Sequence, residues 1–442
     1  MPPAATWIHL SDLHRGARGE TRDWPVVRDA FARDLDRMAR LVGAPDLVLF
    51  TGDLAFKGAE DEYAQVEALF DWLDSKLGKR PIYAVPGNHD MARPEEDWRF
   101  SWLFSEDANA RAARADMLQR DPGPIAAFFE GYQRFAERRL ALPGLATGLL
   151  PGDTRVSLDL SGFKLGLLGL NSAWRQYKGG DFQGHVGVDP HQVHALLPDG
   201  ADAFRDAHHL TLLLQHHPPD WMGDRAQWMS HVATAGHVVL FGHMHANRAE
   251  VHRAESNEDR PMVQARSLCG LERYGTARED RRFGYRWGRA EVVDLGADGL
   301  RTRVRTWSRT LVEGGRWRFV HPNAAEYEEA EGMRLVDVRL PEHLRPAPRP
   351  PAVQAPEGTP SAPSEGAELT RDQRYDVLVK LLPAQFNDVV VRSGAPMAMF
   401  SAREAPLAER AWEVASWVDN QPRETRERFD GLLRAKAGGL FE

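Results

Sequence analysis

Aspartate, asparagine and histidine residues stand in five short clusters along this chain of 442 residues. The clusters are Asp12 to His14, Thr51 to Asp53, Gly87 to Asp90, Gln215 to His217 and Gly242 to His245. Carboxylate, amide and imidazole groups together suit divalent ions of borderline or hard character, such as Mn, Fe, Zn, Ni or Co. None of the clusters contains cysteine, which argues against a structural zinc site. The clusters are therefore candidates for a metal centre of another kind.

Each cluster follows a short apolar run with the length of a buried β-strand. The five runs are Trp7–Leu10, Leu47–Phe50, Ile82–Val85, Leu210–Leu214 and Val238–Phe241. One such ending is a weak signal, because Gly, Asn and Asp are also common in ordinary turns. Five of them in one chain are hard to reach by chance. Ligands of open α/β sheets lie outside the carboxyl ends of the strands, which is where these clusters stand.

Two amphipathic helices are predicted between the first three strands. Apolar residues repeat at helical spacing in residues 24–42 and 60–77. The alternation of strands and helices is the βαβ pattern, which favours right-handed parallel crossovers. Parallel strands end at the same edge of a sheet, so Asp12, Asp53 and Asn88 are predicted to lie on one edge.

In chain order the clusters read D-x-H, G-D, G-N-H-D, a strand-ending His and G-H-x-H. This set resembles the calcineurin-like metallophosphoesterase family, over roughly Thr6 to Leu340. The resemblance implies an α/β fold, a four-layer α/β/β/α sandwich, and two divalent metal ions with Asp53 bridging them. The remaining ligands that it implies are Asp12, His14 and His245 for one metal, and Asn88, His216 and His243 for the second.

The family resemblance also implies the chemistry. Two divalent ions roughly 3.5–4 Å apart can bind phosphoryl oxygens and acidify a bridging water. The expected reaction is therefore hydrolysis of a phosphate ester by attack of a metal-bridging hydroxide. His89 is expected to face the substrate and to protonate or orient the leaving oxygen, as imidazole can near neutral pH. Asp90 is expected to hold the His89 ring in orientation. No residue is identified that reads the rest of the substrate.

The turn at the third cluster favours phosphodiesters. Val85-Pro86 precede Gly87, whereas the Ser/Thr protein phosphatases of the family carry R-G-N-H-E at this place. Protein phosphatase activity is therefore disfavoured. Cleavage of a cyclic nucleotide or of nucleic acid fits the motif better, and a phosphomonoester or nucleotide substrate stays open.

The rest of the first domain, residues 1–340, is predicted as follows. A helical insertion at about residues 92–142 either forms a wall or lid of the site or packs without touching substrate. Residues 154–160 and 164–170 form a hairpin. Strands near Met262-Val263 and at residues 285–295, 301–308 and 316–320 are expected to complete the second sheet.

One segment has the composition of a nucleic-acid surface. Arg266 to Arg289 holds seven arginines interleaved with aromatic residues. Basic and aromatic residues together are typical of grooves for single-stranded nucleic acid. Alternating strands with solvated arginines give the same pattern, and Glu272, Glu279 and Asp280 dilute the charge.

Composition gives no sign of a membrane or an oxidising compartment. The net charge of −8 gives no general attraction to nucleic acid or anionic lipid. Cys269 is the only cysteine, so no intrachain disulfide can form. The chain shows no signal-peptide pattern at its start and no apolar run of roughly 20 residues. We expect a cytoplasmic protein that does not contact membranes.

The last hundred residues differ in composition from the first domain. Residues 341–368 are rich in Pro, Ala, Glu and Ser and are predicted to be an extended linker. Residues 369–442 are predicted to form a small all-α bundle. Tyr375, Leu378, Val379 and Leu382 follow helical spacing, with Thr370 as N-cap.

This tail resembles the death-like effector-associated adaptor domains of bacterial conflict-system effectors. The residues concerned are Phe386 to Val389, Ala408 to Ala411, Trp417 and Leu432-Leu433. The resemblance implies docking to a protein partner that carries the same module. A plain oligomerisation or packing bundle fits the pattern equally well.

Three functions are compatible with the whole chain. The first is a metallophosphoesterase tethered to a protein-interaction domain, and the second is an effector enzyme activated through its adaptor tail. The third is a catalytically inactive docking scaffold. The intact set of candidate ligands, together with His89, disfavours the scaffold.

Overall fold

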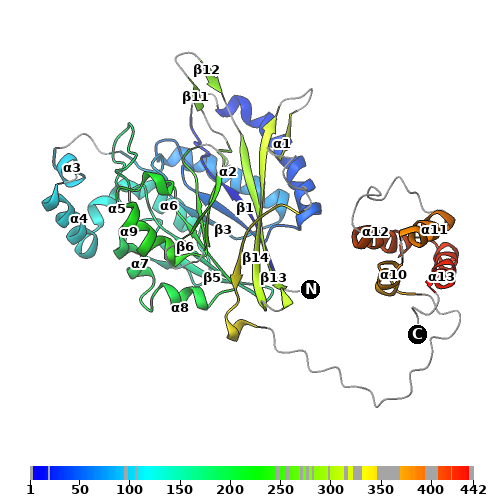
Figure 1. The fold of residues 1–442 in the computed structure, drawn as a ribbon. Helices are drawn as coiled ribbons and strands as arrows, with labels where there is room; N and C mark the ends of the chain where they lie inside the picture. Colours follow the sequence, from blue (N-terminus) through cyan, green and yellow to red (C-terminus); the bar gives the residue numbers. More distant parts are fainter. Residues whose placement is uncertain are drawn as a thin grey trace. The chain divides into compact units, whose positions relative to one another are not determined.

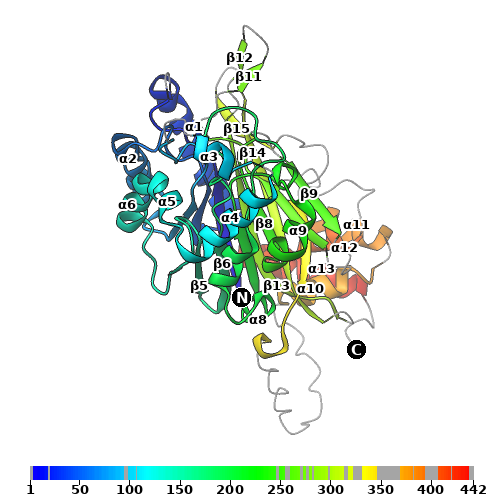
Figure 2. The ribbon, with the colours of Figure 1, turned by 90° about the vertical axis from the view of Figure 1, so that its left-hand side faces the viewer.

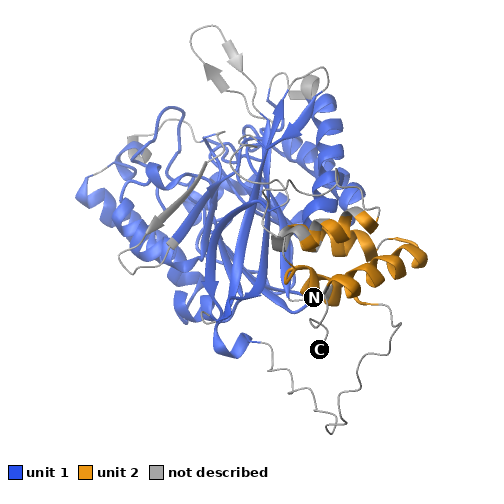
Figure 3. Cartoon of the chain, turned by 45° about the vertical axis from the view of Figure 1, so that its right-hand side comes forward, with its two compact units in different colours: residues 1–346 blue, residues 347–442 orange. Residues whose placement is uncertain are grey.

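The computed structural model describes residues 3–17, 20–93, 98–105, 107–244, 248–253, 259–268, 272–274, 278–280, 283–296, 299–312, 317–321, 331–345, 369–381, 383–393, 407–419 and 421–437. The chain divides into two compact units, residues 1–346 and residues 347–442 (Figure 3). Most of the predicted linker, residues 346–368, lies outside the described residues.

The first sheet of the first unit has the strand order β15-β14-β13-β1-β2-β3, with β16 also paired to β14. Its strands are β1 (Ala4–Leu10), β2 (Leu47–Thr51), β3 (Ile82–Val85), β13 (Gly284–Asp294), β14 (Leu300–Val312), β15 (Arg318–Val320) and β16 (Met333–Arg339). β1, β2 and β3 are parallel, as predicted. The predicted crossover helices connect them as α1 (Glu20–Val42) and α2 (Glu60–Leu77).

The second sheet has the strand order β4-β5-β6-β7-β8-β10-β9. Its strands are β4 (Ala146–Thr147), β5 (Thr154–Leu160), β6 (Phe163–Gly169), β7 (Leu210–Leu214), β8 (Val238–Phe241), β9 (Arg248–Arg253) and β10 (Asp259–Gln264). β6, β7, β8 and β10 are parallel, and β5 forms the predicted hairpin with β6. A separate pair consists of β11 (Glu272–Tyr274) and β12 (Arg278–Asp280).

The two sheets face each other across one apolar core, and helices cover their other faces. Alternate residues of a strand point to opposite faces. Trp7 of β1 accordingly packs with Leu49 and Leu212 between the sheets, while Ile8 joins the core that includes Phe31 and Phe70 of the helices. Figure 1 shows α1 beside the first sheet and α7 (Pro190–Leu196), α8 (Ala201–Asp206) and α9 (Arg225–Gln227) beside the second.

The placement of the late strands differs from the prediction. β13, β14 and β15 were expected in the second sheet, but they extend the first, and of the predicted group only the strand around Met262 joins the second. The reason is the free edge of β1, which β13 covers as an antiparallel neighbour. Ala290 and Val292 of β13 then enter the same inter-sheet core as Trp7.

The predicted insertion is helical. It contains α3 (Trp98–Leu103), α4 (Ala108–Arg120), α5 (Gly123–Ala126), a short 3-10 turn (Ala127–Phe129) and α6 (Glu130–Arg139). α6 packs on α2, with the Phe135 ring stacked on Tyr63 at 5.0 Å between centroids. The Tyr132 hydroxyl also donates to the Ala84 carbonyl of β3 at 2.9 Å. The last part of the insertion is therefore anchored to the strand that leads into the GNHD turn.

In the second unit the described residues form four helices around a core of their own. They are α10 (Arg371–Leu378), α11 (Pro383–Ser393), α12 (Leu407–Asp419) and α13 (Arg423–Ala437). Leu378, Phe386, Val414 and Phe429 are buried in that core. Thr370 caps α10 as predicted, accepting the Gln373 amide at 3.3 Å. Among the helices described in either unit, none is both long and apolar enough to cross a membrane.

Candidate metal centre

The predicted site residues meet at the carboxyl ends of parallel strands from both sheets. Asp12 and His14 follow β1, Asp53 follows β2, and Asn88 to Asp90 follow β3. His216 follows β7 and His243 follows β8. The sandwich thereby brings together side chains more than two hundred residues apart in sequence: the amide of His243 donates to Asp12 Oδ2 at 3.1 Å. His245, the last of the predicted ligands, lies outside the described residues.

Asp53 occupies the middle of the site. Its carboxylate Oδ2 lies 3.3 Å from His216 Nε2 and 3.8 Å from His14 Nε2. Oδ1 accepts the backbone amide of His89 at 2.8 Å, which fixes the carboxylate plane. One oxygen of Asp53 thus faces histidines from both predicted metal-binding groups, as a bridging carboxylate would.

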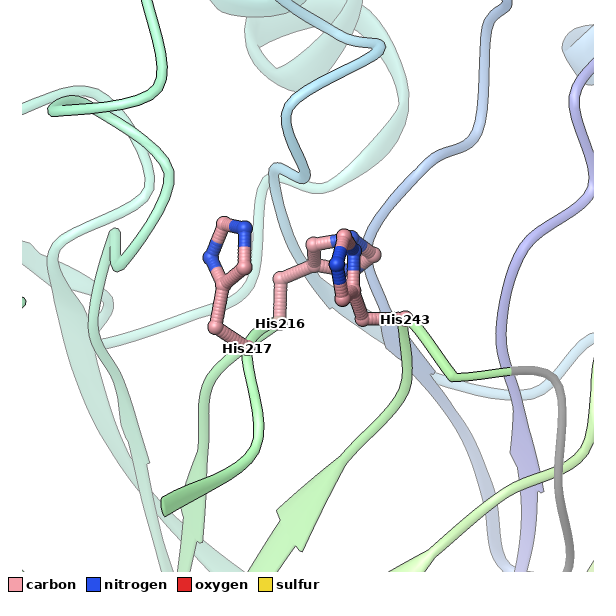
Figure 4. A group of neighbouring side chains, drawn as sticks. All are labelled: His216, His217 and His243. Atoms are coloured by element: carbon pink, nitrogen blue, oxygen red, sulfur yellow. The ribbon is translucent and has the colours of Figure 1, made fainter. Parts of the chain in front are cut away.

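His216 presents a ring nitrogen to that carboxylate because its other nitrogen is held elsewhere. His216 Nδ1 lies 2.7 Å from the Thr51 carbonyl, which can only accept, so Nδ1 carries the hydrogen. In the neutral ring, Nε2 then has its lone pair facing Asn88 Oδ1 at 3.2 Å and Asp53 Oδ2. His243 Nδ1 lies 3.1 Å from the same Nε2 (Figure 4). With a neutral His216 ring, Nε2, Asn88 Oδ1 and Asp53 Oδ2 are all acceptors, and a proton or a metal ion is needed between them.

The electrostatics of the site favour a cation at this place. Burial alone would lower the pKa of His216, but the Asp53 carboxylate outweighs burial and raises that pKa to about 9. Burial alone would likewise raise the pKa of Asp53, and the imidazoles of His216, His89 and His14 hold it well below its usual range. A proton between the two side chains is therefore strongly bound, and a divalent ion can take its position.

The neighbouring His217 is held differently. Its Nδ1 lies 3.1 Å from Ser172 Oγ, and its Nε2 lies 2.7 Å from Gln176 Oε1. Burial, reinforced by the nearby His243 and His216, lowers the pKa of His217 well below its usual value. Figure 4 shows its ring to one side of the His216 and His243 rings. Both of its nitrogens are thus engaged by the protein, and the geometry favours His216 as the ligand of this pair.

His89 has one nitrogen fixed and one available. Its Nδ1 lies 2.8 Å from the Phe56 carbonyl, so this nitrogen carries the hydrogen. The ring stacks on Phe56 at 5.2 Å between centroids and meets the edge of the His14 ring at 4.7 Å. His89 is half-buried, unlike Asn88, which is buried.

The expected role of Asp90 is corrected by its contacts. The His89 ring is oriented by the Phe56 carbonyl and not by Asp90. The Asp90 carboxylate accepts the amides of Leu54, Ala55 and Gly87 at 3.1, 2.9 and 2.9 Å, and the Tyr63 hydroxyl at 3.1 Å. Burial, with the nearby Asp53, raises the pKa of Asp90 to about 6. Asp90 therefore ties the loop after β2 to the loop after β3, and it acts on His89 only through the backbone.

The backbone of the site is strained. Five described non-glycine residues have positive φ angles, and four of them are Asp12 (53°), His14 (47°), Asp53 (54°) and His243 (71°). Such conformations are uncommon outside glycine and persist only where the surrounding structure enforces them, which is often at functional sites. Gly87 is needed for a related reason: a Cβ there would lie 2.1 Å from Asp53 Oδ1.

Two aromatic residues of the site were not found from the sequence. Phe56 stacks on His89, and the half-buried Trp221 meets the edge of His243 at 4.3 Å between ring centroids. Trp221 also lies parallel to His217 at 6.0 Å. Each follows one of the five clusters by a few residues, but their sequence spacing does not distinguish them from aromatic residues of the core. Phe56 thus lies beside His14 and His89, and Trp221 beside His217 and His243.

Three residues of the basic and aromatic segment belong to the core of the sandwich. Tyr285, Arg286 and Trp287 are buried. The Tyr285 hydroxyl donates to Asp34 at 2.6 Å, and the Arg286 guanidinium donates to the Gln264 carbonyl at 2.5 Å. These three side chains stabilise the sandwich, and nucleic-acid contact by the other residues of the segment stays a prediction.

Comparison with known proteins identifies the family. A sequence profile described as "Calcineurin-like phosphoesterase" matches residues 6–247. The chain belongs to the calcineurin-like phosphoesterase family.

Two curated relatives match part of the chain. The "Probable cyclic nucleotide phosphodiesterase" of Rhodococcus erythropolis is 36% identical over 104 residues, covering 23% of this chain and 32% of that protein. The "Probable glycerophosphodiester phosphodiesterase GpdQ" of Arcobacter nitrofigilis is 32% identical over 98 residues, covering 21% of this chain and 34% of that protein. The match thus spans about a third of the length of these relatives.

A solved structure, purple acid phosphatase PPD1 from seeds of yellow lupin (Lupinus luteus), aligns with a TM-score of 0.38 at 12% identity. The alignment covers 69% of this chain and 52% of that one. At this TM-score the likeness carries no weight for function.

Proposed function

We propose that the first unit is a dinuclear metal-dependent phosphodiesterase. The observation that carries this proposal is that Asn88 Oδ1 and Asp53 Oδ2 lie 3.2 and 3.3 Å from His216 Nε2 in a buried site. Asp53 would bridge two divalent ions, with Asp12, His14 and His245 on one side and Asn88, His216 and His243 on the other. The mixture of carboxylate, amide and imidazole fits Mn, Fe, Zn, Ni or Co.

The bound ions would supply electrostatic stabilisation of the phosphoryl oxygens and a lowered pKa for an attacking water. The protein's part is to hold the donors rigidly. The Thr51 carbonyl fixes the tautomer of His216, and the backbone amide of His89 fixes the carboxylate of Asp53. Both hydrogen bonds orient the ligands, and the one that His216 donates to the Thr51 carbonyl also increases the basicity of its Nε2.

His89 is the proposed general acid. Because its Nδ1–H is directed at the Phe56 carbonyl, the protonated ring can release only the Nε2 proton toward the site. Its ring lies beside His14, so a leaving oxygen bound near the ligands would be within reach of Nε2. Proton transfer of this kind contributes roughly 10²- to 10⁴-fold to turnover.

A diester is the proposed substrate class. The GNHD turn lacks the arginine of the protein phosphatases, and both relatives described above are named as phosphodiesterases. Trp221 and Phe56 are half-buried aromatic residues beside the candidate site, and stacking of a nucleobase on such a ring is worth roughly 1–3 kcal/mol per base. Cyclic nucleotides and nucleic acid are therefore the first substrates to test.

Hydrolysis of bis-p-nitrophenyl phosphate and of p-nitrophenyl phosphate, with Mn added, tests the proposal. Wild type should turn over the diester faster than the monoester. His89→Ala should retain the metals but lose about 10²- to 10⁴-fold in turnover of the diester. Absence of turnover with either ester, with metals bound, would favour the gated effector or the inactive scaffold. Loss of metal from His89→Ala would place His89 among the ligands instead.

The role of residues 369–442 as a protein-interaction domain stays a prediction. Its support is that α10–α13 have a hydrophobic core separate from the cores of the first unit. The segment expressed alone should self-associate or bind a partner with the same module, which sedimentation of the purified segment at rising concentration can test. If the segment stays monomeric, binding to a different protein with the same module is the remaining possibility. If it binds no such protein either, recruitment through this unit is excluded.

A further inference from the structure

A large basic cavity lies at the end of the first unit opposite the candidate metal centre. Its volume is about 1090 Å³, and it lies between α8, the start of β14, β16 and the short 3-10 turn (Glu342–Leu344). Figures 1 and 2 both show the gold segment that follows β16 next to α8. His237 lines the cavity and precedes β8, whereas His243 of the candidate centre follows the same strand. The cavity is therefore a separate site.

Arginine dominates the lining. Six arginines and three acidic residues line the cavity, although the chain as a whole has a net charge of −8. Some of the arginines have protein partners: Arg334 pairs with Asp337, and the Arg260 guanidinium donates to the Gly236 carbonyl at 2.8 Å. Within the described ranges of the chain, no carboxylate forms an ion pair with Arg301, Arg339 or Arg345.

The pairing of β14 with β16 shows which arginines carry the unbalanced positive charge. These strands are antiparallel, and Arg303 of β14 stands opposite Asp337 of β16, with guanidinium-to-carboxylate distances of 3.1 and 3.0 Å. Two residues further along the same face, Arg301 stands directly opposite Arg339. Like charges in directly opposed positions destabilise a sheet. The ladder thus holds one neutralised pair and one pair that lacks an anion.

We propose that this cavity binds a small multivalent anion with two or more phosphate groups, held by Arg301, Arg339 and Arg345. The planar guanidinium group binds phosphate oxygens in a bidentate manner, and an anion between Arg301 and Arg339 removes their repulsion. The cavity volume is close to the upper end of small-molecule sites, roughly 300–1,000 Å³. The cavity lies between α8 and the 3-10 turn and is bounded on several sides, so it suits a compact anion better than an extended nucleic-acid backbone.

The anion site would be independent of the proposed hydrolytic function. It would include a residue near the end of the first unit. Arg345 belongs to the segment that ends the first unit at residue 346. A bound anion would therefore contact both the sheet and the residues that lead toward the second unit. The expected consequence is a more stable first unit, with no change in the chemistry of the metal centre.

Calorimetric titration of the full-length protein with inorganic triphosphate tests the proposal. Wild type should bind one triphosphate per chain at this site, and Arg301→Gln/Arg339→Gln should bind it at least about tenfold more weakly, because charge-assisted hydrogen bonds are lost. The matched control is Arg318→Gln, an exposed arginine on β15, which should bind like wild type. All three proteins have the same candidate metal centre, so any binding there is common to them, and their turnover of bis-p-nitrophenyl phosphate should be equal.

Thermal unfolding provides a second readout. In phosphate-free buffer of low ionic strength, Arg339→Gln should unfold at a higher temperature than wild type, because the repulsion with Arg301 is gone. Triphosphate should then raise the unfolding temperature of wild type more than that of the variant. Equal affinity of wild type and the double variant for triphosphate would overturn the proposal. Salt-sensitive binding of a single-stranded oligonucleotide, without binding of triphosphate, would also overturn it and indicate a nucleic-acid surface.

Discussion

Buried polar side chains serve different ends in the two units. In the second unit Arg374 is buried, and its guanidinium donates to Asp430 at 2.6 and 2.9 Å and to Asp419 at 2.6 Å. In the first unit His216 and Asp53 are equally buried, and His216 Nε2 lies close to Asp53 Oδ2 and Asn88 Oδ1. Among the described residues, no Lys or Arg side chain pairs with these atoms. The cluster around Arg374 is satisfied by its own charges, whereas the acceptors around Asp53 need a bound proton or a metal ion.

This difference shows what separates a structural cluster from a chemical one. Charged groups are buried in both clusters, so burial alone does not distinguish a structural cluster from a metal site. A group of opposite charges that satisfy one another fixes how helices pack, whereas a group of acceptors facing one another is stable only with a cation. The strained backbone at Asp12, His14, Asp53 and His243 points the same way, because the protein holds these residues in unfavourable conformations.

The largest expected effect is that of Asp53→Asn. Removing the shared carboxylate should lower metal content and reduce diester turnover by more than the roughly 10²- to 10⁴-fold expected for a general acid. Metal analysis of the purified protein and kcat/KM for bis-p-nitrophenyl phosphate measure both. Asp199→Asn, at an exposed loop residue, is the control and should behave as wild type. Two metals per chain in Asp53→Asn would show that Asp53 does not bridge them.

A comparison of adjacent residues sharpens the distinction within the site itself. His216→Gln should lose metal and lower turnover by about 100-fold or more, because a proposed ligand is removed. His217→Gln should keep the metals and lower turnover by about 10-fold, because its ring packs against the proposed ligand His243. Metal content and kcat measured on both variants separate the two outcomes. The reverse order of effects would assign His217 as the ligand.

The corresponding test in the second unit concerns Arg374→Met. This change leaves the buried Asp430 without its cation, which should destabilise residues 369–442 by about 3–5 kcal/mol. Urea unfolding of that segment measures the loss. The double variant Arg374→Met/Asp430→Leu should regain part of the stability, since the uncompensated carboxylate is gone. Diester turnover of the full-length Arg374→Met protein should match wild type, and a loss of turnover would mean that the two units are coupled in catalysis.

The smallest expected effect is a gain of stability from Gly431→Ala in α13. A Cβ at Gly431 would meet no atom within 4 Å, and alanine has the higher helix propensity. The substitution should stabilise residues 369–442 by about 0.5–1 kcal/mol. The same urea unfolding experiment detects it. A destabilised variant would show that this face of α13 packs against another element in solution.

Much of the fold of the first unit and many of its site residues could be predicted from the sequence. The bounds of β3, β7, β8 and α2 agree with the apolar runs and helical periodicity, because strands and helices of this length are determined locally. The chain order of the clusters also indicated that Asp12, His14, Asp53, Asn88, His216 and His243 belong together, and these residues meet in the structure, whereas His245 lies outside the described residues. The assignment of β13–β15 to a sheet was wrong, since alternation of apolar residues gives a strand its buried face and not its neighbour.

The details of the site depend on tertiary contacts that leave no local pattern. The Phe56 carbonyl orients His89 from a loop 33 residues away, and a carbonyl contributes no sequence signal. Asp90 stands next to His89 in sequence, yet its carboxylate bonds to the backbone after β2. Trp221 belongs to a short helical turn whose position follows from the fold of the second sheet. Adjacency in sequence was therefore a poor guide to which group orients which.

The most direct test of a dinuclear hydrolytic centre is metal stoichiometry measured together with turnover of bis-p-nitrophenyl phosphate. The full-length protein is stripped with a chelator and then titrated with Mn while both quantities are followed. A dinuclear centre predicts no turnover in the stripped protein and full turnover only as the second equivalent of Mn per chain binds. Turnover that survives complete removal of metal, or that is full at one equivalent, would contradict it.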